Sequence, residues 1–418
     1  MKACIFTLGC KVNEVESASV AAALKSWGAE VEERLCPADI YVLNTCAVTR
    51  EAEKKSRQLV ARARKYNNEA KIFVVGCASE KDSRSFEEKG VFYVGGARRK
   101  NELISVLAKE LGREYAATNN EQDYEILPEP VGMRTRAFIK IEDGCNNFCS
   151  YCVIPYLRGR VRSRSAREIL CEVNNTSCPE VVLTGINISA YNYGGADLAG
   201  LITMMSGADK RIRLGSIECR VIDERFLSAC RSLKNFAPQF HLSLQSGSDE
   251  VLRAMNRRYT RAQYLEKCAL IYQYFPAAAI TCDIIAGFPT ETEQDFADSL
   301  SIIDEVGFAR VHAFAFSPRE GTAAFNMKDI PYAVKEERLQ RLLAAAKLAE
   351  ERYVLKFIGS TQSVIFEDME GEYTVGYTPN YIKVWLYGDH SGEVLNVALT
   401  EPREGGALAV LAENSAKN

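Results

Sequence analysis

The chain has 418 residues, of which 47% are hydrophobic and 26% are charged, and this composition is typical of a globular protein. It excludes a long disordered chain, a collagen-like repeat and a coiled coil, and the formal net charge of −3 does not suggest a strongly basic nucleic-acid binder. Fourteen cysteines accompany only three histidines, so a metal site in this chain would have to consist mainly of thiolates.

Residues 1–112 alternate short apolar runs with segments of helical periodicity. The apolar runs are Ala3–Leu8, Asp39–Asn44, Lys71–Val75 and Val91–Val94. The helical patterns are Glu14–Trp27, Thr49–Tyr66, Glu80–Lys89 and Asn101–Leu111. This alternation predicts βαβ units and an N-terminal α/β domain built on an open parallel sheet.

The first residues enter a strand-like run without the apolar region or the small-residue cleavage site of a signal peptide. No apolar run is long enough to span a membrane. We therefore expect a cytoplasmic protein whose thiols stay reduced, and in that setting clustered cysteines bind metal or do redox work.

Residues 113–134 are polar and contain two prolines, so they are expected to form a linker. Residues 135–358 hold six apolar runs, each followed by a helix-like segment. The runs are Ala137–Glu142, Glu180–Thr184, Ile212–Ile217, Phe240–Leu244, Ile280–Ala286 and Val311–Phe316. Six such units predict a partial TIM-type (βα)6 barrel, which the amphipathic stretch Val334–Phe357 would close.

The sequence pattern changes in residues 359–418, where short runs of alternating apolar and polar residues lie between turn signals. The runs are Thr361–Phe366, Glu372–Gly376, Ile382–Leu386, Glu393–Leu399 and Ala407–Leu411. Five short strands in so few residues predict a small β-barrel of OB-like type. This segment holds nine acidic and only three basic residues, so it is a poor phosphate binder by charge alone.

Three cysteines stand close together in Cys145-Asn-Asn-Phe-Cys149-Ser-Tyr-Cys152, directly after the first strand of the predicted barrel. Three thiolates at this spacing can hold three irons of a 4Fe-4S cluster and leave the fourth iron free for a substrate. Barrel folds place their chemistry at such strand ends. Zinc binding and simple packing are the alternatives, although a zinc site would more often add a second cysteine pair.

Three further cysteines occupy equivalent places in the N-terminal domain, because each follows a predicted strand and precedes a helix. They are Cys10, Cys46 and Cys77. If their strands are neighbours, the three thiols converge on one edge of the sheet, where open α/β sheets bind ligands. The helix N-termini that follow would favour thiolate and a negatively charged cluster. A single cysteine in such a place would more often be a small core residue.

The cysteine motif at residues 145–152 resembles the radical S-adenosylmethionine (SAM) superfamily, with Tyr151 as the aromatic residue before its last cysteine. The segments TLGCKVN (7–13), NTCAVT (44–49) and GCASE (76–80) resemble the N-terminal domain of methylthiotransferases, although Ala78 departs mildly from that pattern. The resemblance covers almost the whole chain. It implies a methylthiotransferase domain at 1–112, a radical SAM barrel at 135–358, a TRAM domain at 359–418, and two 4Fe-4S clusters with SAM as cofactors.

Within this family, residues 143–164, 213–218, 241–260 and 376–384 look most like enzymes acting on N6-threonylcarbamoyladenosine at position 37 of tRNA. The resemblance implies that a first SAM methylates a sulfur at the Cys10/Cys46/Cys77 cluster. A second SAM then yields a 5′-deoxyadenosyl radical, and a methylthio group is inserted at C2 of the adenine. The alternatives are a methylthiotransferase for isopentenyladenosine in tRNA or for a ribosomal-protein aspartate, and a non-catalytic iron–sulfur RNA-binding protein.

The same resemblance implies contacts to SAM at the barrel strand ends. The expected contacts are Tyr151, Gly185, Asn187, Ser243, Gln245, Arg257, Ile285 and Gly287. Gly185 and Asn187 would lie near the methionine amino group, Ser243 and Gln245 near the ribose, and Arg257 would pair with the carboxylate. Each of these residues could instead serve only a turn or a structural hydrogen bond.

A basic run follows the cysteine loop of the barrel, and we expect it to contact phosphates of the tRNA anticodon stem-loop. It comprises Arg158, Arg160, Arg162 and Arg164. Arg50–Lys65 is a second basic segment, and a solvated face is the alternative for both. An electron donor is a further expected partner, a monomer is the default, and the remaining eight cysteines are expected to be small core residues.

Overall fold

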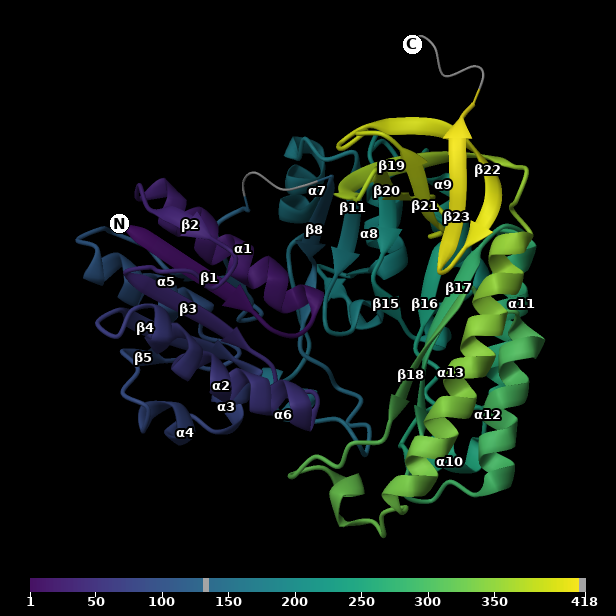
Figure 1. Cartoon of the computed structure of the whole chain (residues 1–418), viewed down its shortest axis with the longest axis horizontal. Coiled ribbons are helices and arrows are strands. Elements are labelled where there is room, and N and C mark those ends of the chain that lie inside the picture. The colour runs from purple at the N-terminus through teal and green to yellow at the C-terminus, as the bar shows by residue number, and fades with distance from the viewer. Residues whose placement is uncertain (131–134, 413–418) are drawn as a thin grey trace.

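The N-terminal part of the chain forms a five-stranded parallel sheet in the computed structural model, which describes residues 1–130 and 135–412 (Figure 1). In sheet order the strands are β2 (Glu30–Glu32), β1 (Lys2–Thr7), β3 (Ile40–Thr45), β4 (Lys71–Gly76) and β5 (Tyr93–Val94). The predicted open parallel sheet is confirmed, with the short edge strand β2 as an addition.

Helices cover both faces of this sheet. They are α1 (Lys11–Ser26), α2 (Arg50–Tyr66), α3 (Cys77–Lys81), α4 (Arg84–Glu87) and α5 (Lys100–Glu110). Leu24 of α1 and Leu107 of α5 share one core with Val42 of β3, whereas Leu59 of α2 packs on the opposite face with Tyr41. The polar helix expected near residues 80–89 is split into α3 and α4.

The segment expected to be a linker contains a two-stranded hairpin of β6 (Thr118–Asn119) and β7 (Glu125–Ile126). The buried hydroxyl of Tyr124 donates to the carbonyl of Lys140 at 3.0 Å, which fastens the hairpin to the next domain. Residues 131–134 of the expected linker and 413–418 of the expected TRAM domain lie outside the described residues.

Parallel strands then form a partial barrel, and all six strands expected from the sequence are present. They are β8 (Arg136–Lys140), β11 (Glu180–Thr184), β14 (Arg211–Leu214) with β15 (Ser216–Ile217), β16 (Gln239–Leu242), β17 (Ala279–Ala286) and β18 (Arg310–Ala315). The third strand is interrupted at Gly215, so that the wall consists of the sheets β14-β11-β8 and β15-β16-β17-β18. Along β8, Ala137 and Ile139 pack into the main core, so the alternate side chains face the barrel interior.

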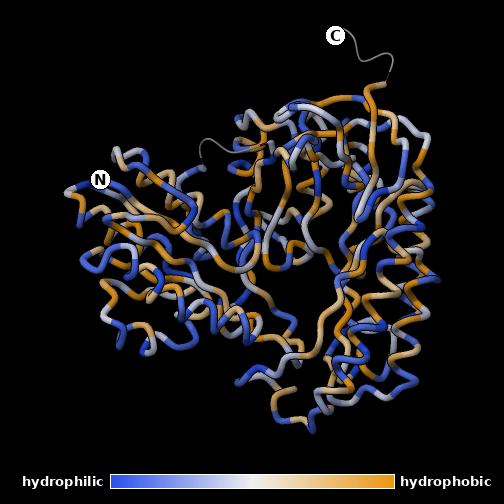
Figure 2. The backbone as a smooth tube through the Cα atoms, in the orientation of Figure 1, coloured by the Kyte–Doolittle hydropathy of each residue, from blue (hydrophilic) through white to orange (hydrophobic). Residues whose placement is uncertain are grey.

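Helices pack on the outer face of this barrel. They are α7 (Ala166–Asn175), α8 (Leu198–Met204), α9 (Glu224–Ser232), α10 (Asp249–Ala254), α11 (Arg261–Tyr274), α12 (Glu293–Val306) and α13 (Tyr332–Leu355). The helices at the right of Figure 2 alternate hydrophobic and hydrophilic positions, as expected for helices with one buried face. In the part of the chain that the structure describes, no helix combines the length and hydropathy needed to cross a bilayer.

The C-terminal strands close into a small barrel, as the sequence predicts. In barrel order they are β19 (Thr361–Glu370), β20 (Tyr373–Tyr377), β21 (Lys383–Tyr387), β23 (Gly406–Leu411) and β22 (Val394–Arg403). This domain contacts the amino ends of the central strands, because Arg213 of β14 donates to the carbonyls of Thr378 and Pro379 at 3.2 and 3.1 Å. It therefore lies at the end of the central barrel opposite the cysteine loop. That loop is at the other end, where the chain continues from β8 toward Cys145.

Candidate functional site

The N-terminal triad, which we define as Cys10, Cys46 and Cys77, lies along one edge of the parallel sheet. The three cysteines follow β1, β3 and β4, which are adjacent strands, so the expected neighbourhood is confirmed. Gly9 has φ +112°, and a Cβ there would lie only 3.1 Å from Sγ of Cys46. Gly76 also has φ +112°, so glycine is required before two of the three cysteines.

Burial raises the pKa of two thiols of this triad. Cys46 and Cys77 are buried and Cys10 is exposed. Burial raises the pKa of Cys77 to about 11 and also raises the pKa of Cys46. Desolvation of Cys46 and Cys77 therefore opposes the thiolate form that the helix N-termini are expected to favour. A bound metal cluster would have to supply the charge that keeps them deprotonated.

The barrel triad, which we define as Cys145, Cys149 and Cys152, lies on the loop after β9 (Glu142–Asp143). Gly144 has φ +89°, and a Cβ there would lie 2.1 Å from the carbonyl oxygen of Arg160, so the loop needs glycine at this point. The backbone N–H of Ser150 donates to the carbonyl of Met255 at 3.0 Å and holds the loop on α10. Burial raises the pKa of Cys152 to about 12.

Each triad offers three thiols, which is the donor set for three irons of a 4Fe-4S cluster. Among residues 1–130 and 135–412, no three His, Cys, Asp or Glu side chains gather around one point as ligands of one ion. A 4Fe-4S cluster takes one thiolate at each iron, so its ligands stand around a larger body. Three thiols in each triad could hold three irons of such a cluster.

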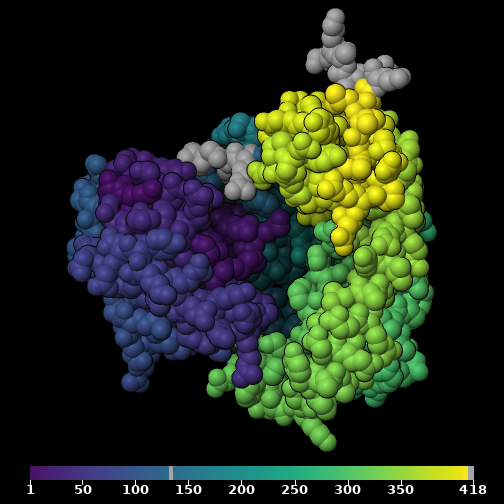
Figure 3. Space-filling view, viewed as in Figure 1, coloured from purple at the N-terminus to yellow at the C-terminus, as the bar shows by residue number. Residues whose placement is uncertain are grey.

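A hydrophobic contact places the two triads close to each other. Helix α6 (Ile154–Arg158) begins two residues after Cys152 and lies against α3, which begins at Cys77 (Figure 1). Val153 and Leu157 share one buried core with Cys77 and Ala78. The arrangement brings two potential clusters to one junction between the N-terminal domain and the barrel. Figure 3 shows the molecule hollowed where these two parts face each other.

Several of the expected SAM contacts lie beside the barrel triad. Nδ2 of Asn187 is 3.9 Å from Sγ of Cys145, and Nη1 of Arg257 is 3.3 Å from Sγ of Cys149. Tyr151 packs on a hydrophobic cluster that includes Phe288. These groups could hold a ligand of the open iron and shield it from water.

The other expected contacts lie at neighbouring strand ends. Ser243 accepts from Nη2 of Arg257 through its carbonyl at 3.2 Å, and the N–H of Ile285 donates to the carbonyl of Gln245 at 2.9 Å. Gly287 donates its N–H to Oε1 of a buried glutamate, Glu291, at 2.8 Å. A Cβ at the last expected contact, Gly185, would lie 2.8 Å from Oε2 of Glu142. The positions of these side chains do not test whether they contact SAM. The eight residues therefore remain predicted SAM contacts.

The sequence analysis did not identify two acidic residues at the barrel triad. Glu142 is buried, accepts from the N–H of Asn187 at 2.7 Å, and its Oε1 has no hydrogen-bond partner among the described residues. Burial raises the pKa of Glu142 to about 8. Glu218 accepts from Nδ2 of Asn147 and lies 3.9 Å from Nη1 of Arg257. In the sequence, both glutamates could have been identified as site residues from their positions at the ends of the first and third predicted strands.

The expected phosphate contacts are wrong for most of the basic run. Arg158 has no exposed surface, and Arg162 is buried and donates to the carbonyls of Arg158 and Arg160. Arg164 forms an ion pair with Glu172. Only Arg160 is exposed, with its guanidinium 4.5 Å from the Phe148 ring centre. The sequence shows where the arginines lie but not that buried acids neutralise them.

Arg158 belongs to a buried charge network that joins the two parts of the site. Its Nη1 lies 2.9 Å from Glu16 of α1 and 3.1 Å from Asp143 of β9. Lys100 of α5 and Lys140 of β8 also pair with Glu16, at 2.9 and 2.7 Å. Burial alone would raise the pKa of Glu16, but these three cations hold it well below its ordinary value.

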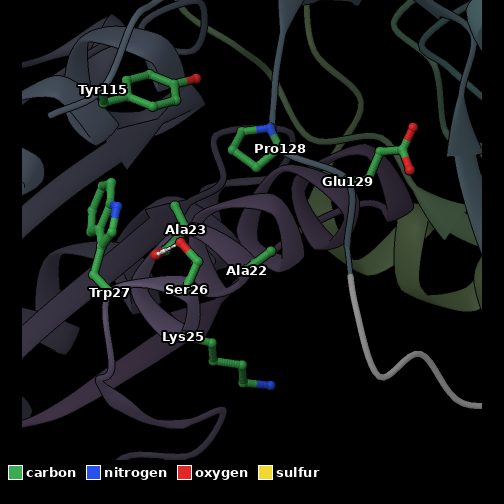
Figure 4. A pocket seen from close by; sticks show the side chains of 8 residues that line it. All are labelled: Ala22, Ala23, Lys25, Ser26, Trp27, Tyr115, Pro128 and Glu129. Atoms are coloured by element: carbon green, nitrogen blue, oxygen red, sulfur yellow. Dashed lines mark hydrogen bonds between the residues drawn. The ribbon is translucent and has the colours of Figure 1, made fainter.

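A separate groove of about 450 Å³ lies at the other end of α1 from Cys10 (Figure 4). Trp27, Tyr115 and Pro128 contribute its apolar surface, and Lys25 and Glu129 lie at its rim. Its position separates it from both triads.

The comparisons with known proteins agree with this arrangement. Residues 2–95 match the model described as Uncharacterized protein family UPF0004, and residues 139–303 match the Radical SAM superfamily. A solved structure of the radical SAM methyltransferase TsrM from Kitasatospora setae has a TM-score of 0.54 at 14% identity, and the match covers 78% of this chain and 77% of that one. At that identity the likeness concerns the fold alone.

Two curated relatives match over most of their length. The chain is 38% identical over 384 residues to threonylcarbamoyladenosine tRNA methylthiotransferase MtaB of Chlamydia pneumoniae, covering 90% of this chain and 89% of that protein. It is 35% identical over 381 residues to tRNA-2-methylthio-N(6)-dimethylallyladenosine synthase of Fervidobacterium nodosum, covering 88% of each. From the paired triads, the two matching family models and these relatives, we conclude that the chain belongs to the tRNA methylthiotransferase family of radical SAM enzymes.

Proposed function

We propose that this protein replaces the hydrogen at C2 of N6-threonylcarbamoyladenosine 37 in tRNA with a methylthio group. The observation that carries this proposal is the pair of cysteine triads on either side of the contact between α3 and α6. The relative at 38% identity is named for that substrate. Residues 1–112, 135–358 and 359–418 act in this proposal as the methylthiotransferase, radical SAM and TRAM domains.

The chain's own contribution is to hold and orient the reacting groups. When bound, two 4Fe-4S clusters and SAM supply the electron, the radical, the sulfur and the methyl group. The barrel triad holds one cluster, and Asn187 and Arg257 lie beside it to orient the ligand of its open iron. The N-terminal triad holds the other cluster. The hydrophobic residues packed around Tyr151 exclude water from the junction.

We propose that the anticodon stem-loop binds across the junction of the two domains. A loop nucleotide can be splayed out without melting a helix, so the base can enter the hollow between them. Exposed cations on the rim would contact phosphates: Arg160 of the cysteine loop, and Arg50, Lys54, Lys55, Arg62 and Lys65 of α2. A one-electron donor must also dock, and the protein acts as a monomer in this proposal.

The test is anaerobic reconstitution of both clusters, followed by mass spectrometry of nucleosides from tRNA that lacks the methylthio group. Wild-type protein should add a methylthio mass to threonylcarbamoyladenosine when SAM and a reductant are present. Parallel reactions contain tRNA with isopentenyladenosine and a ribosomal-protein substrate. Modification of isopentenyladenosine alone would overturn the substrate assignment and would favour the function named for the relative at 35% identity.

A further inference from the structure

The exposed side chain of Lys11 reaches from the N-terminal domain to Phe138 on β8 of the central barrel. Lys11 directly follows Cys10 and begins α1. Its ammonium lies 4.2 Å from the ring centre of Phe138, one of the β8 side chains that face the barrel interior. Among the described residues, no carboxylate forms an ion pair with this ammonium. A cation adjacent to the N-terminal triad therefore faces the barrel without a paired anion.

The barrel wall next to Lys11 is itself rich in cations. The guanidiniums of Arg136, Arg211 and Arg213 surround the buried carboxylate of Glu180, with nearest N···O distances of 2.8, 3.6 and 2.9 Å. Arg136 is 9% exposed, and within the described part of the chain its Nη2 has no hydrogen-bond partner.

The charges around Lys11 favour the binding of an additional anion. Besides Glu180, two acids act near these cations: Glu367, 3.4 Å from Nε of Arg136, and the exposed Glu14. The exposed Glu14 is screened by solvent, so the exposed Lys11 has no buried carboxylate in an ion pair with it among the described residues. The charges of Arg136 and Arg213 both act on Lys11, so an additional anion at Lys11 would be stabilised.

We propose that Lys11 binds the carboxylate of the threonylcarbamoyl substituent and so distinguishes this substrate from adenosines with an uncharged N6 group. The inference rests on the proposed function. The sulfur must reach C2 from the N-terminal triad, and N6 is carried by C6, which only N1 separates from C2 on the same edge of the adenine ring. The substituent therefore lies near the triad as well, within reach of Lys11, which directly follows Cys10 and covers Phe138 on the barrel wall. An isopentenyl group at that place would leave the ammonium unpaired against hydrocarbon.

The experiment measures binding of reconstituted holoenzyme to two forms of one tRNA, with threonylcarbamoyladenosine or unmodified adenosine at position 37, by fluorescence anisotropy. The variants are Lys11→Gln, which removes the charge, and Lys11→Arg, which keeps it. Lys25→Gln is the matched control, because Lys25 is exposed on the same helix but distant from Cys10. Iron content of each variant verifies that the N-terminal triad still holds its cluster.

The Lys11→Gln substitution should weaken binding of the threonylcarbamoyl form about 30-fold, which is the range for a hydrogen bond to a charged group, and leave the unmodified form unchanged. Lys11→Arg should restore most of the loss, and Lys25→Gln should change neither affinity. Equal weakening of both forms would mean that Lys11 binds a phosphate, and no change would mean that it binds neither; each result overturns the proposal. Absence of any preference in the wild type would likewise overturn the proposal, whereas failure of the wild type to modify the threonylcarbamoyl form would instead overturn the proposed function.

Discussion

The two cysteine triads reach similar chemistry by different structural routes. The barrel triad lies within eight consecutive residues, on one loop that turns at Gly144. The N-terminal triad is assembled from three strands, and its first and last members are separated by two complete βα units. The first site depends mainly on local loop geometry, whereas the second exists only when the sheet has formed and the glycines before Cys10 and Cys77 allow close approach. A shared spacing motif is therefore not required for a shared function.

The strongest way to separate the triads is to remove one thiol from each. Cys149→Ala should abolish reductive SAM cleavage and methylthio transfer, because the cluster near the expected SAM contacts loses a ligand. Cys46→Ala should abolish methylthio transfer but retain SAM cleavage, because the barrel triad is intact. Iron analysis of each variant should show about half of the wild-type content, and product analysis by mass spectrometry separates the two reactions.

The matched control for this experiment is Cys171→Ala, since Cys171 is exposed on α7 and distant from either triad in the fold. It should retain full iron content and both reactions. Loss of SAM cleavage in Cys46→Ala at full occupancy of the barrel cluster would contradict the division of labour between the triads.

The sequence was sufficient for the parts of this site that depend on strand order. The strand runs ending before Cys10, Cys46 and Cys77 predicted their convergence, since parallel strands of a βαβ sheet present their carboxyl ends at one edge. The burial and pairing of Arg158 could not be predicted, because its partner Glu16 lies on another domain and nothing in either local sequence links the two residues. Charge patterns in sequence do not distinguish a solvated arginine from one that neutralises a buried acid.

The next largest effect should come from Arg158, which connects the two triads through Glu16 and Asp143. Arg158→Met removes one of the two buried cations that pair with both carboxylates and leaves only Lys140 shared between them. Removing one partner of a buried ion pair costs about 3–5 kcal/mol. Urea denaturation should show this decrease in the free energy of unfolding, and iron loss from the N-terminal triad should accompany it.

Arg160→Met is the control, because Arg160 is two residues away but exposed. Its free energy of unfolding should stay within about 0.5 kcal/mol of wild type. An equal decrease in the free energy of unfolding for the two variants would mean that the buried charge network of Arg158 does not hold the domains together.

The two triads should also differ in their response to pH through the glutamates beside them. The pKa of Glu142 is raised by burial to about 8, above its ordinary value, so the folded state retains a proton that the unfolded state releases. Stability should therefore fall as pH rises toward about 8, by at most about 1.4 kcal/mol per pH unit for this group. Glu16 has a lowered pKa, so its contribution is instead lost on acidification.

Glu142→Gln tests this difference, since the amide oxygen can still accept from the N–H of Asn187 but cannot ionise. The free energy of unfolding, measured by urea denaturation from about pH 5 to about pH 9, should decline less steeply in the variant than in wild type. Glu250→Gln, an exposed substitution on α10, should leave the slope unchanged. Parallel curves for wild type and Glu142→Gln would contradict the raised pKa.

The smallest expected effects concern the rims of the two triads, where Arg160 stands on the barrel side and Lys54 of α2 on the N-terminal side. Both side chains are exposed. Charge reversal of either, Arg160→Glu or Lys54→Glu, should weaken tRNA binding by about fivefold and reduce the slope of log affinity against log salt by about 0.7–0.9 for each phosphate that is no longer neutralised. If the anticodon stem spans both rims, the two effects should add in the double variant, because the sites are separate. Weakening by one reversal alone would place the RNA on a single domain, and the two triads would then differ in their access to the substrate as well as in their construction.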